Sequence, residues 1–436
     1  MVARSMRDTA EFMNIGVDQL RVGLYIQLDL SWMNHPFFSN SFKIADQRQL
    51  KTLKSLGLRE IRYCPAKSDC APLPVVPPEL AENVPVAEAA PEEVDADQRA
   101  EMDAKQARIE RLYRHHESIR RCEQRLLAAG RDIKRINDNL FSKSSDTVRI
   151  ATELISNMAE SLLVNKDVAI HAISDKVGSE EVYYHALNVT VLSMMLAREL
   201  GQSREQIQGI GMGALFHDIG KRNLPDWILR KTEGLTRAET NLLQQHVAFG
   251  EEIGAKLDLP ATTVDIIRQH HECADGSGYP KGLKGEAFPL SARIVSLVNV
   301  FDNLCNPLNP ERALTPHEAV SSMFAKSRGL FDSTALTTFI RMMGVYPPGT
   351  LVRLSNDFWG LVLSVNVRMP LKPGILIFDP AIPKEEAIML DLKDDPRINI
   401  SKACRQNQLP QEAIEYLNPR KRVTYYFDED ADGDAE

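Results

Sequence analysis

The sequence predicts a multidomain protein in which an all-α helical domain follows a small α+β domain and a helical connector, and precedes a small β module. Three observations support this fold class. Amphipathic helical patterns fill the middle of the chain, a proline-rich stretch separates them from the first domain, and alternating apolar patterns follow them. The expected boundaries are 1–70 for the α+β domain, 71–97 for a linker, 98–144 for the connector, 145–343 for the helical domain, 344–418 for the β module and 419–436 for an acidic tail.

The first domain is predicted from two short apolar runs on either side of one helix. Leu20–Ile26 and Arg59–Tyr63 run apolar or alternate, which is typical of strands. Ala45–Leu56 has a helical pattern, and Gly57 is placed to end it, because glycine readily adopts the left-handed conformation that closes a helix. Strands packed with a helix make a small α+β domain.

Residues 71–96 are a predicted linker. They contain six prolines, at positions 72, 74, 77, 78, 85 and 91, among alanine, valine and glutamate. A segment of this composition buries too little apolar surface to offset the entropy lost on ordering it, so we expect it to be extended or disordered.

The connector after the linker carries a seven-residue apolar repeat. Every seventh position is a large aliphatic residue: Leu112, Ile119, Leu126, Ile133 and Leu140. Intermediate positions are filled by Cys122, Ala129 and Ile136. Such a seam predicts a coiled-coil homodimer, but a single helix that packs on its own helical domain has the same repeat. The sequence leaves both alternatives open.

Residues 145–343 alternate amphipathic helical patterns with short loops. Glu180–Leu200 is one long pattern, and Gly201 is placed to stop it. Further helices are predicted at 205–218, 236–256, 261–271, 290–305 and 315–343. We expect no strand in this domain. Beyond it, antiparallel strands are predicted at 350–354, 359–365 and 374–378, then a helix at 410–417 and an acidic, solvated tail at 428–436.

Composition narrows the classes of protein. The chain has 436 residues, 43% of them hydrophobic and 26% charged, as in soluble globular proteins. No apolar run reaches the roughly 18 residues of a membrane span, and the N-terminus lacks the apolar core of a secretory signal. The six cysteines include no Cys-x-x-Cys pair, so a reduced, cytoplasmic location is expected. A net charge of −8 disfavours binding to a nucleic-acid polymer.

Metal-binding side chains are concentrated in the helical domain. The segment from 181 to 271 contains Glu181, His185, His217, Asp218, His246, His270 and His271, and these include five of the ten histidines of the chain. Mixed imidazole and carboxylate ligands suit manganese, iron or zinc, and this set exceeds what one ion can use. Because an imidazole nitrogen has one lone pair, a ligand shared by two ions must be a carboxylate, and Asp218 is the natural bridge. Paired divalent ions in hydrolases commonly serve to cleave phosphate esters.

The sequence segments around these ligands form four motifs: His185-x-x-Asn-Val189, His217-Asp-Ile-Gly-Lys221, Leu235-Thr-x-x-Glu239 ahead of His246, and His270-His-Glu-x-x-Asp-Gly-x-Gly-Tyr-Pro280. They resemble the HD-GYP family, a branch of the HD phosphohydrolases, over roughly residues 145–340. The N-terminal words Val22–Tyr25 and Ser31–Phe37 resemble a domain of unknown function often found ahead of it. The resemblance implies a bacterial, all-helical HD-type domain that hydrolyses cyclic di-GMP to the linear dinucleotide or to GMP.

The resemblance also implies a set of site residues. The metal ligands would be Glu181, His185, His217, Asp218, His246, His270, His271 and Asn299. Together they would hold two or three divalent ions, iron or manganese first, with zinc, magnesium or nickel as alternatives. Asp218 and Lys221 would be catalytic, and substrate would meet Lys221, Asp275, Gly278, Tyr279, Pro280 and Arg293.

Three of these side chains have two interpretations. Lys221 could neutralise phosphate charge in the transition state or be a surface lysine. Tyr279 could stack on a guanine or support a partner surface, or the Gly-Tyr-Pro residues could only shape their loop. Arg293 could reach a phosphate or base edge, or pair with a nearby carboxylate.

Two departures from the family pattern leave two functions open. Asn299 occupies the position of the last aspartate ligand, and a neutral amide binds metal weakly. Asp302, one turn later, is a candidate replacement. The family's Arg-Pro-Tyr segment is absent, with Arg312 as the nearby cation. The first hypothesis is an active cyclic di-GMP phosphodiesterase. The alternative is a degenerate domain that senses nucleotide, or that binds protein partners such as diguanylate cyclases; an HD hydrolase for another cyclic dinucleotide is a third reading.

Overall fold

The computed structural model describes most of the chain. The described residues are 12–30, 35, 37, 40–74, 96–142, 144–164, 169–173, 181–326, 328–366, 369–380, 382, 384, 387–395, 397–419 and 424–428, of which 96–106, 108–109, 111–112, 169–173, 181–182 and 428 are described by their backbone only. The chain divides into two compact units, one of residues 1–113 and 379–389 and the other of residues 114–378 and 390–436. The predicted linker falls mainly on residues 75–95, outside the described residues.

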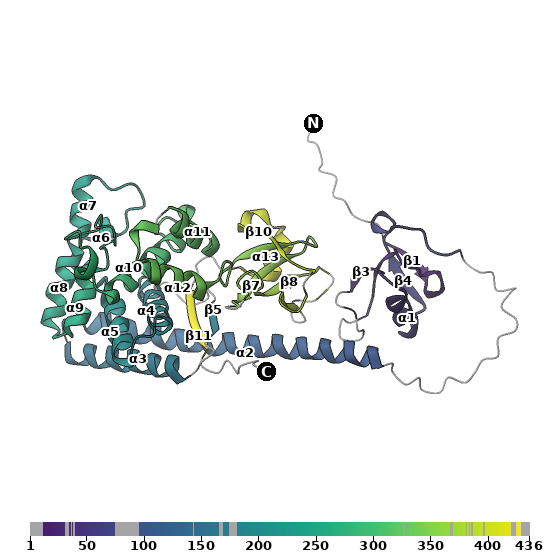
Figure 1. Cartoon of the computed structure of the whole chain (residues 1–436), viewed down its shortest axis with the longest axis horizontal. Coiled ribbons are helices and arrows are strands. Elements are labelled where there is room, and N and C mark those ends of the chain that lie inside the picture. The colour runs from purple at the N-terminus through teal and green to yellow at the C-terminus, as the bar shows by residue number, and fades with distance from the viewer. Residues whose placement is uncertain are drawn as a thin grey trace. The chain divides into compact units, whose positions relative to one another are not determined.

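The first unit contains a small α+β domain (Figure 1). Its elements are β1 (Met13–Gly16), β2 (Tyr25–Gln27), β3 (Ser41–Lys43), α1 (Gln47–Ser55) and β4 (Glu60–Tyr63), and the strands form an antiparallel sheet of order β1-β4-β2-β3. The predicted helix and the second predicted strand are confirmed. The first predicted strand is shorter than expected, because the chain turns at Gly23, whose φ is +98°. Strands β1 and β3 were not predicted.

The second unit contains the connector helix from residue 114 on and the predicted helices of the helical domain (Figure 1). They are α2 (Ala96–Asn139), of which residues from 114 on belong to this unit, α3 (Ser144–Val164), α4 (Glu181–Glu199), α5 (Arg204–Phe216), α6 (Asp226–Leu229), α7 (Arg237–Gln244), α8 (His246–Lys256), α9 (Ala261–Gln269), α10 (Leu290–Cys305), α11 (Pro316–Lys326) and α12 (Ser333–Met343). A 3₁₀ turn, η5 (Ile219–Asn223), follows α5. Among the described residues, no helix has both the length and the apolar run that crossing a bilayer requires.

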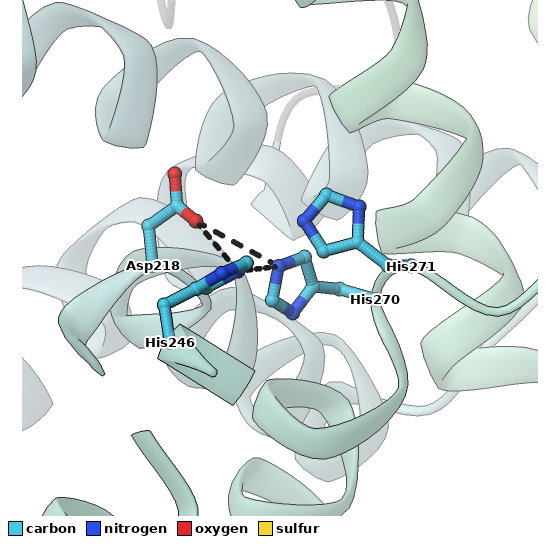
Figure 2. A group of neighbouring side chains, drawn as sticks. All are labelled: Asp218, His246, His270 and His271. Carbon is cyan, nitrogen blue, oxygen red and sulfur yellow. Dashed lines mark hydrogen bonds and ion pairs between the residues drawn. The ribbon is translucent and has the colours of Figure 1, made fainter. Parts of the chain in front are cut away.

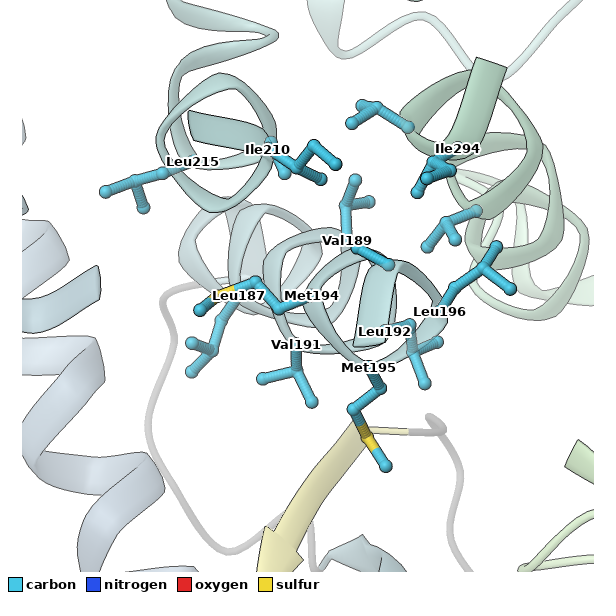
Figure 3. Packing of buried hydrophobic residues seen from close by; sticks show 14 of the residues in the cluster. Leu187, Val189, Val191, Leu192, Met194, Met195, Leu196, Ile210, Leu215 and Ile294 are labelled. Atoms are coloured by element: carbon cyan, nitrogen blue, oxygen red, sulfur yellow. The ribbon is translucent and has the colours of Figure 1, made fainter. Parts of the chain in front are cut away.

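Helix α4 lies in the middle of this core and carries the first candidate ligands. Its buried side chains include Leu187, Val191, Met194 and Leu196, which face different directions around the helix (Figure 3). A helix that is apolar on every side is surrounded by other elements. Accordingly α4 packs against α5, α10 and α12, so its polar residues are held in fixed positions by the core.

The connector helix packs its apolar seam against its own helical domain. From residue 114 on, the seam residues Cys122, Leu126, Ala129, Ile133, Ile136 and Leu140 are buried in the same hydrophobic cluster as α4 and α5. Ile119 is only partly buried and lies outside this cluster, and the side chain of Leu112 is outside the described part. This half of the repeat therefore follows the second alternative, while pairing between chains stays a prediction.

Because the seam residues differ in burial, introducing a negative charge should lower the unfolding free energy by different amounts at Leu126 and at Ile119. Leu126→Asp places a carboxylate at a side chain that is 1% exposed, so we expect a loss of unfolding free energy of at least about 3 kcal/mol. Ile119→Asp, on the same seam but partly buried, is the matched control and should cost far less. Chemical denaturation measures both, and light scattering reports the mass. Equal losses that accompany conversion of a dimer to a monomer would instead support a coiled coil.

A two-stranded ribbon interrupts the helical domain and corrects two expectations. Strand β5 (Ala169–Ile173) pairs antiparallel with β11 (Thr424–Asp428), although no strand was expected between 145 and 343 and residues 419–436 were expected to form an acidic tail. Tyr425, Tyr426 and Phe427 are buried in the core cluster of the domain. The acidic composition of the last residues conceals this short aromatic run, which has enough apolar surface to dock.

The β module after the helical domain is confirmed. Strands β6 (Leu351–Leu354), β7 (Trp359–Ser364) and β8 (Gly374–Phe378) are antiparallel neighbours, and β10 (Ile400–Cys404) pairs with β6. The chain also forms β9 (Ile388–Asp391) and the predicted helix, α13 (Gln411–Leu417). Strand β8 is buried at all five positions, as expected of an inner strand.

Candidate metal centre

The candidate ligands converge because most of them lie at the ends of helices. His217 and Asp218 lie where α5 ends and η5 begins, His246 is the first residue of α8, and His270 and His271 follow the end of α9. His185 lies in the second turn of α4. Helices α4, α5, α8 and α9 pack on one another, so segments distant in the sequence meet at one place.

Two overlapping groups of ligands share one carboxylate. Asp218, His246, His270 and His271 form the first group, which we call the three-histidine group (Figure 2). His185, His217 and Asp218 form the second, the His185 group. Within each group the ligand atoms lie within 4.8 Å of one another. Asp218 is common to both, so it lies where a bridging ligand would be needed.

The two oxygens of Asp218 face different groups. Oδ2 lies 3.3 Å from His217 Nε2 and 3.5 Å from His185 Nε2. Oδ1 lies 3.5 Å from His246 Nε2 and 3.7 Å from His270 Nε2. One carboxylate oxygen is therefore directed at each group, which is the arrangement needed to hold two cations side by side.

Backbone carbonyls set the orientation of three imidazole rings. His217 Nδ1 donates to the carbonyl of Ala214 at 2.7 Å. His246 Nδ1 donates in the same way to Leu243 at 2.6 Å, and His270 Nδ1 to Ile267 at 2.8 Å. A ring whose Nδ1–H is bound to a carbonyl presents the lone pair of Nε2, and this is how metal-binding histidines are usually held.

The three-histidine group fits a cation, because its acceptor atoms face one another without a donor from the described part of the chain between them. His246 Nε2 and His270 Nε2 lie 3.3 Å apart, and each ring already uses its Nδ1–H elsewhere, so two lone pairs face one another. Beside them, Asp218 Oδ1 lies 3.5 Å from His246 Nε2 and 3.7 Å from His270 Nε2, is buried and has no hydrogen-bond partner among the described residues. Such facing acceptors are costly without a positive charge between them. A divalent metal ion satisfies all of them at once.

The protonation states match this chemistry. Burial lowers the pKa of His246, lowers that of His270 to about 4, and lowers that of His271 well below its usual value. These three rings are therefore neutral at pH 7. Burial alone would raise the pKa of Asp218, but Lys221 and His217 outweigh it and hold the pKa well below the usual value. Neutral imidazoles and an ionised carboxylate are the forms that bind metals.

His185 differs from the other histidines. Burial lowers its pKa, but hydrogen bonds to Asp218 and Asp302 outweigh burial and raise the pKa to about 9. Its Nδ1 lies 2.6 Å from Asp302 Oδ2, and its Nε2 lies 3.2 Å from His217 Nε2. A carboxylate behind the ring orients it and makes Nε2 a stronger metal ligand.

Gly220 allows the turn with Asp218 and Lys221 to approach α8. A Cβ at Gly220 would lie 1.9 Å from the carbonyl oxygen of His246 and 2.4 Å from the amide nitrogen of Gly250. Only glycine permits this contact between two backbones. Lys221 Nζ lies 2.5 Å from Asp218 Oδ2, and its side chain is 38% exposed, so its positive charge is both next to Asp218 and accessible to solvent.

Sequence reasoning did not assign Glu272, which holds the loop of the Gly-Tyr-Pro signature. Its buried carboxylate accepts hydrogen bonds from the backbone N–H groups of Lys281 at 2.7 Å and Leu283 at 2.9 Å. In the sequence, the one indication of this role was that Glu272 directly follows two candidate ligands. The segment is too short for a periodic pattern that would predict its burial. A Cβ at Gly278 would lie 2.4 Å from the nitrogen of Cys273, so the closed loop also requires that glycine.

The loop brings Tyr279 against a ligand. Its ring stacks on the His271 ring, with centroids 4.6 Å apart and an angle of 17° between the planes. Asp275 accepts from Ser277 N and Ser277 Oγ within the loop, and Pro280 is exposed. Tyr279 is thus placed to orient His271, and no contact joins Asp275 to the ligands among the interactions of the described residues.

Arg293 makes the structural contacts that were one of its two interpretations. Its guanidinium pairs with Asp332 Oδ2 at 2.9 Å and also donates to the carbonyls of Phe288 and Gly285. These contacts tie the start of α10 to the start of α12. All three donor nitrogens of the side chain are thereby used, which favours a structural role.

The remaining candidates occupy three different situations. Glu181 is the first residue of α4, and its side chain lies outside the described part of the structure. Asn299 is 2% exposed on α10, and its Oδ1 accepts from Asn303 Nδ2 at 2.8 Å. Asp302 belongs to neither ligand group among the described residues and supports His185 from behind. It is therefore placed to orient a ligand, which differs from the replacement role considered for it.

Comparison with known proteins agrees with this geometry. Residues 145–335 match the HD domain, and residues 13–151 match a domain of unknown function, DUF3391. A cyclic di-GMP phosphodiesterase of Pseudomonas aeruginosa is 35% identical over 199 residues, 45% of this chain and 47% of that protein. The cyclic di-GMP phosphodiesterase response regulator RpfG of Xanthomonas campestris is 38% identical over 149 residues, 34% of this chain and 39% of that protein.

A third relative carries a different substrate in its name. The 3'3'-cGAMP-specific phosphodiesterase 3 of Vibrio cholerae is 36% identical over 132 residues, 30% of this chain and 28% of that protein. The chain thus spans less than half of the length of each of these three relatives. The HD domain match, residues 145–335, contains the ligand motifs, and the two matched domains follow one another in the predicted order. The chain therefore has an HD domain with a DUF3391 domain ahead of it, and its relatives include proteins named cyclic di-GMP phosphodiesterases.

Proposed function

We propose that this protein is a metal-dependent phosphodiesterase that hydrolyses cyclic di-GMP to the linear dinucleotide, to GMP or to both. The observation that carries the proposal is Asp218, whose two oxygens face two separate groups of histidines. Such a bridging carboxylate is the mark of a site for paired divalent cations, and cleavage of phosphate esters is the common use of such pairs. The names of the relatives support cyclic di-GMP as the first substrate to test.

The proposed metals are two or three divalent ions, iron or manganese before zinc, magnesium or nickel, because the ligands mix imidazole with carboxylate. When bound, such ions polarise phosphate oxygens and activate a water molecule. The protein supplies imidazole rings whose Nδ1–H groups are held by the carbonyls of Ala214, Leu243 and Ile267. It also supplies the anionic bridge, Asp218, at the place where positive charge must be held.

The proposed contact with the substrate is Lys221. Its ammonium group lies at the partly exposed side of the site, next to the bridging carboxylate. A cation there stabilises negative charge that develops on the phosphate during hydrolysis. In the segment Gly278–Pro280, the Tyr279 ring stacks on the His271 ring and so keeps this ligand in place. We propose that it shapes the entrance for the dinucleotide.

The test is turnover with two substrates. Metal-loaded protein should hydrolyse cyclic di-GMP, and removal of the metal with a chelator should stop the reaction until manganese or iron is returned. Parallel reactions with 3'3'-cGAMP compare the two substrates, since a relative is named for that one. Hydrolysis of 3'3'-cGAMP alone would reassign the substrate. Binding of cyclic di-GMP without hydrolysis by metal-loaded protein would favour the sensor or scaffold, with diguanylate cyclase-type partners.

Asn299 is the observation that keeps the sensor alternative in consideration. A neutral amide stands, buried, where the family pattern has an anionic ligand. Asn299→Asp should tighten metal binding about tenfold to a hundredfold, the scale of perturbations around metal sites, and should leave turnover equal or raise it. The Asn303 Nδ2 donor keeps an acceptor in this variant, so the fold should be preserved. Titration of metal-free protein by calorimetry measures the affinity.

Asn303→Ala is the matched control for this prediction. It removes the hydrogen bond to Asn299 Oδ1 without adding a charge, so metal affinity should change little. An affinity of Asn299→Asp equal to that of the natural protein would show that residue 299 does not reach the metals. In that case the ligand set ends with the two groups around Asp218.

A further inference from the structure

We infer that strand β11, which follows the HD domain match by about ninety residues, is a positioning element of the metal centre. It holds His185 through Asn188 and Asp302, so that the His185 group binds metal only when β11 is docked. The inference rests on the proposed function only in requiring that the site bind metal. It needs no particular substrate.

The connection consists of three consecutive hydrogen bonds. The backbone N–H of Tyr425 donates to Asn188 Oδ1 at 2.9 Å. Asn188 Nδ2 donates to Asp302 Oδ1 at 2.7 Å, and Asp302 Oδ2 lies 2.6 Å from His185 Nδ1. Tyr425, Asn188 and Asp302 are each 1% exposed, so water cannot replace a lost partner at these points.

The chemistry of each partner determines the direction of the connection. A backbone N–H can only donate, so it selects the oxygen of the Asn188 amide. The amide nitrogen is then turned toward Asp302, and a carboxylate accepts it. Asn306 Nδ2 also donates to Asp302 Oδ1, at 2.9 Å, which leaves Oδ2 for His185. The His185 ring therefore has its Nε2 directed at Asp218 and His217.

Strand β11 is anchored by its own side chains, independently of the ligands. Tyr425 and Phe427 are fully buried, and the strand pairs with β5, which precedes α4 in the chain. It packs along α4, the helix that carries both His185 and Asn188 (Figure 3). Docking of a segment 237 residues away in the sequence thus decides the orientation of one metal ligand.

The two ligand groups differ in this dependence. His246 and His270 are oriented by backbone carbonyls three residues before them in the chain, so they need nothing from β11. His185 has no such carbonyl among the hydrogen bonds of the described residues and relies on Asp302 instead. Disturbing the connection should therefore weaken binding at the His185 group and leave the three-histidine group intact.

The first experiment breaks the connection at Asn188. Asn188→Leu has a similar size but neither accepts from Tyr425 nor donates to Asp302. The number of metal ions per chain and their affinities are measured by titrating metal-free full-length protein with manganese. We expect one of two binding events to weaken about tenfold to a hundredfold, the usual cost of removing an outer partner of a ligand. Asn188→Asp, which keeps the acceptor for Tyr425 but loses the donor, should show the same selective loss and serves if the leucine variant does not fold.

The matched control is Ser193→Ala on the same helix. Ser193 is fully buried, and its hydroxyl has no hydrogen-bond partner among the described residues. Its removal alters a buried polar group of α4 without touching the connection, so both binding events should keep their affinities. A loss in this control equal to that in Asn188→Leu would mean that metal binding follows the general stability of α4, and would overturn the inference.

The second experiment tests the strand itself. Tyr425→Ala and Tyr425→Pro both remove the buried ring, but only proline removes the N–H that donates to Asn188. We expect the proline variant to bind the second metal at least about tenfold more weakly than the alanine variant. Equal affinities in the two variants, or natural affinity in both Asn188 variants, overturn the inference and leave the proposed function untouched. If the natural protein binds two metals but does not hydrolyse a cyclic dinucleotide, the proposed function is refuted and the inference about β11 is unaffected. If the natural protein binds no metal, the proposed function and the inference are both refuted.

Discussion

Asp218→Ala is expected to abolish metal binding at both ligand groups and phosphodiesterase activity with it. The carboxylate is the one ligand common to the two groups, and each of its oxygens faces a different group. No neutral side chain of alanine size can bridge two cations or offset their charge. The loss of activity should exceed about a hundredfold, the upper end of the cost of losing a mere outer partner. Metal analysis of the purified variant and turnover of cyclic di-GMP measure the two effects.

A nearby exposed carboxylate serves as the control for this prediction. Asp226 lies in α6, pairs only loosely with Arg230 and has an 83% exposed side chain. Asp226→Ala removes the same charge from the same part of the chain, and both metal content and turnover should be unchanged. Full activity of Asp218→Ala would refute the two-metal centre. Loss of one metal only would show that the second group binds without the bridge.

Gly220→Ala should damage the centre without removing any ligand. The added Cβ would meet two backbone atoms of α8, the His246 carbonyl oxygen at 1.9 Å and the Gly250 nitrogen at 2.4 Å. Backbone cannot move aside as a flexible side chain can, so η5 must move away from α8 and carry Asp218 away from His246. Overpacking of this kind typically costs about 1–3 kcal/mol of unfolding free energy. The separation of Asp218 from the three-histidine group should also lower metal affinity.

Gly234→Ala is the matched control, because a Cβ there would meet nothing within 4 Å. Thermal unfolding with and without manganese separates the two effects of Gly220→Ala. The natural protein and Gly234→Ala should gain stability from the metal, since a ligand that binds only the folded state stabilises it. Gly220→Ala should be less stable without metal and should gain little from it. A gain equal to that of the natural protein would show that η5 can shift without disturbing the ligands.

The sequence by itself determined the helical domain and the β module, and it supplied the candidate metal ligands. The helices from 145 to 343 have long periodic patterns, and local periodicity is sufficient to identify an amphipathic helix. The strands at 351–354, 359–364 and 374–378 are short but bounded by glycine, asparagine and proline. The candidate ligands lie in motifs whose residue types and spacing are specific, so their metal-binding chemistry could be predicted before their positions were known.

The supporting residues were beyond reach of the sequence. Glu272 and Asp302 carry carboxylates like any surface residue, and only the structure shows that one holds a loop and the other a ligand. Arg293 illustrates the same limit, because an arginine suits a contact with substrate and a pairing with a carboxylate equally well, and only the structure shows its pairing with Asp332. A buried charge is recognised by its partner, and partners distant in the chain leave no local pattern.

Tertiary structure alone also decided what the two ends of the second unit do. The heptad pattern around Leu126 fits a coiled coil or a core, because both bury one stripe of a helix, and the partner that covers the stripe is not encoded in its period. Strand β11 has an acidic neighbourhood, yet its aromatic residues find a place beside α4 that exists only in the folded domain. The sequence thus determined which residues could bind metal. The fold decided which of these residues lie next to Asp218 and which distant residues orient them. The reason is that orientation and burial depend on contacts between residues far apart in the chain, which local sequence patterns do not show.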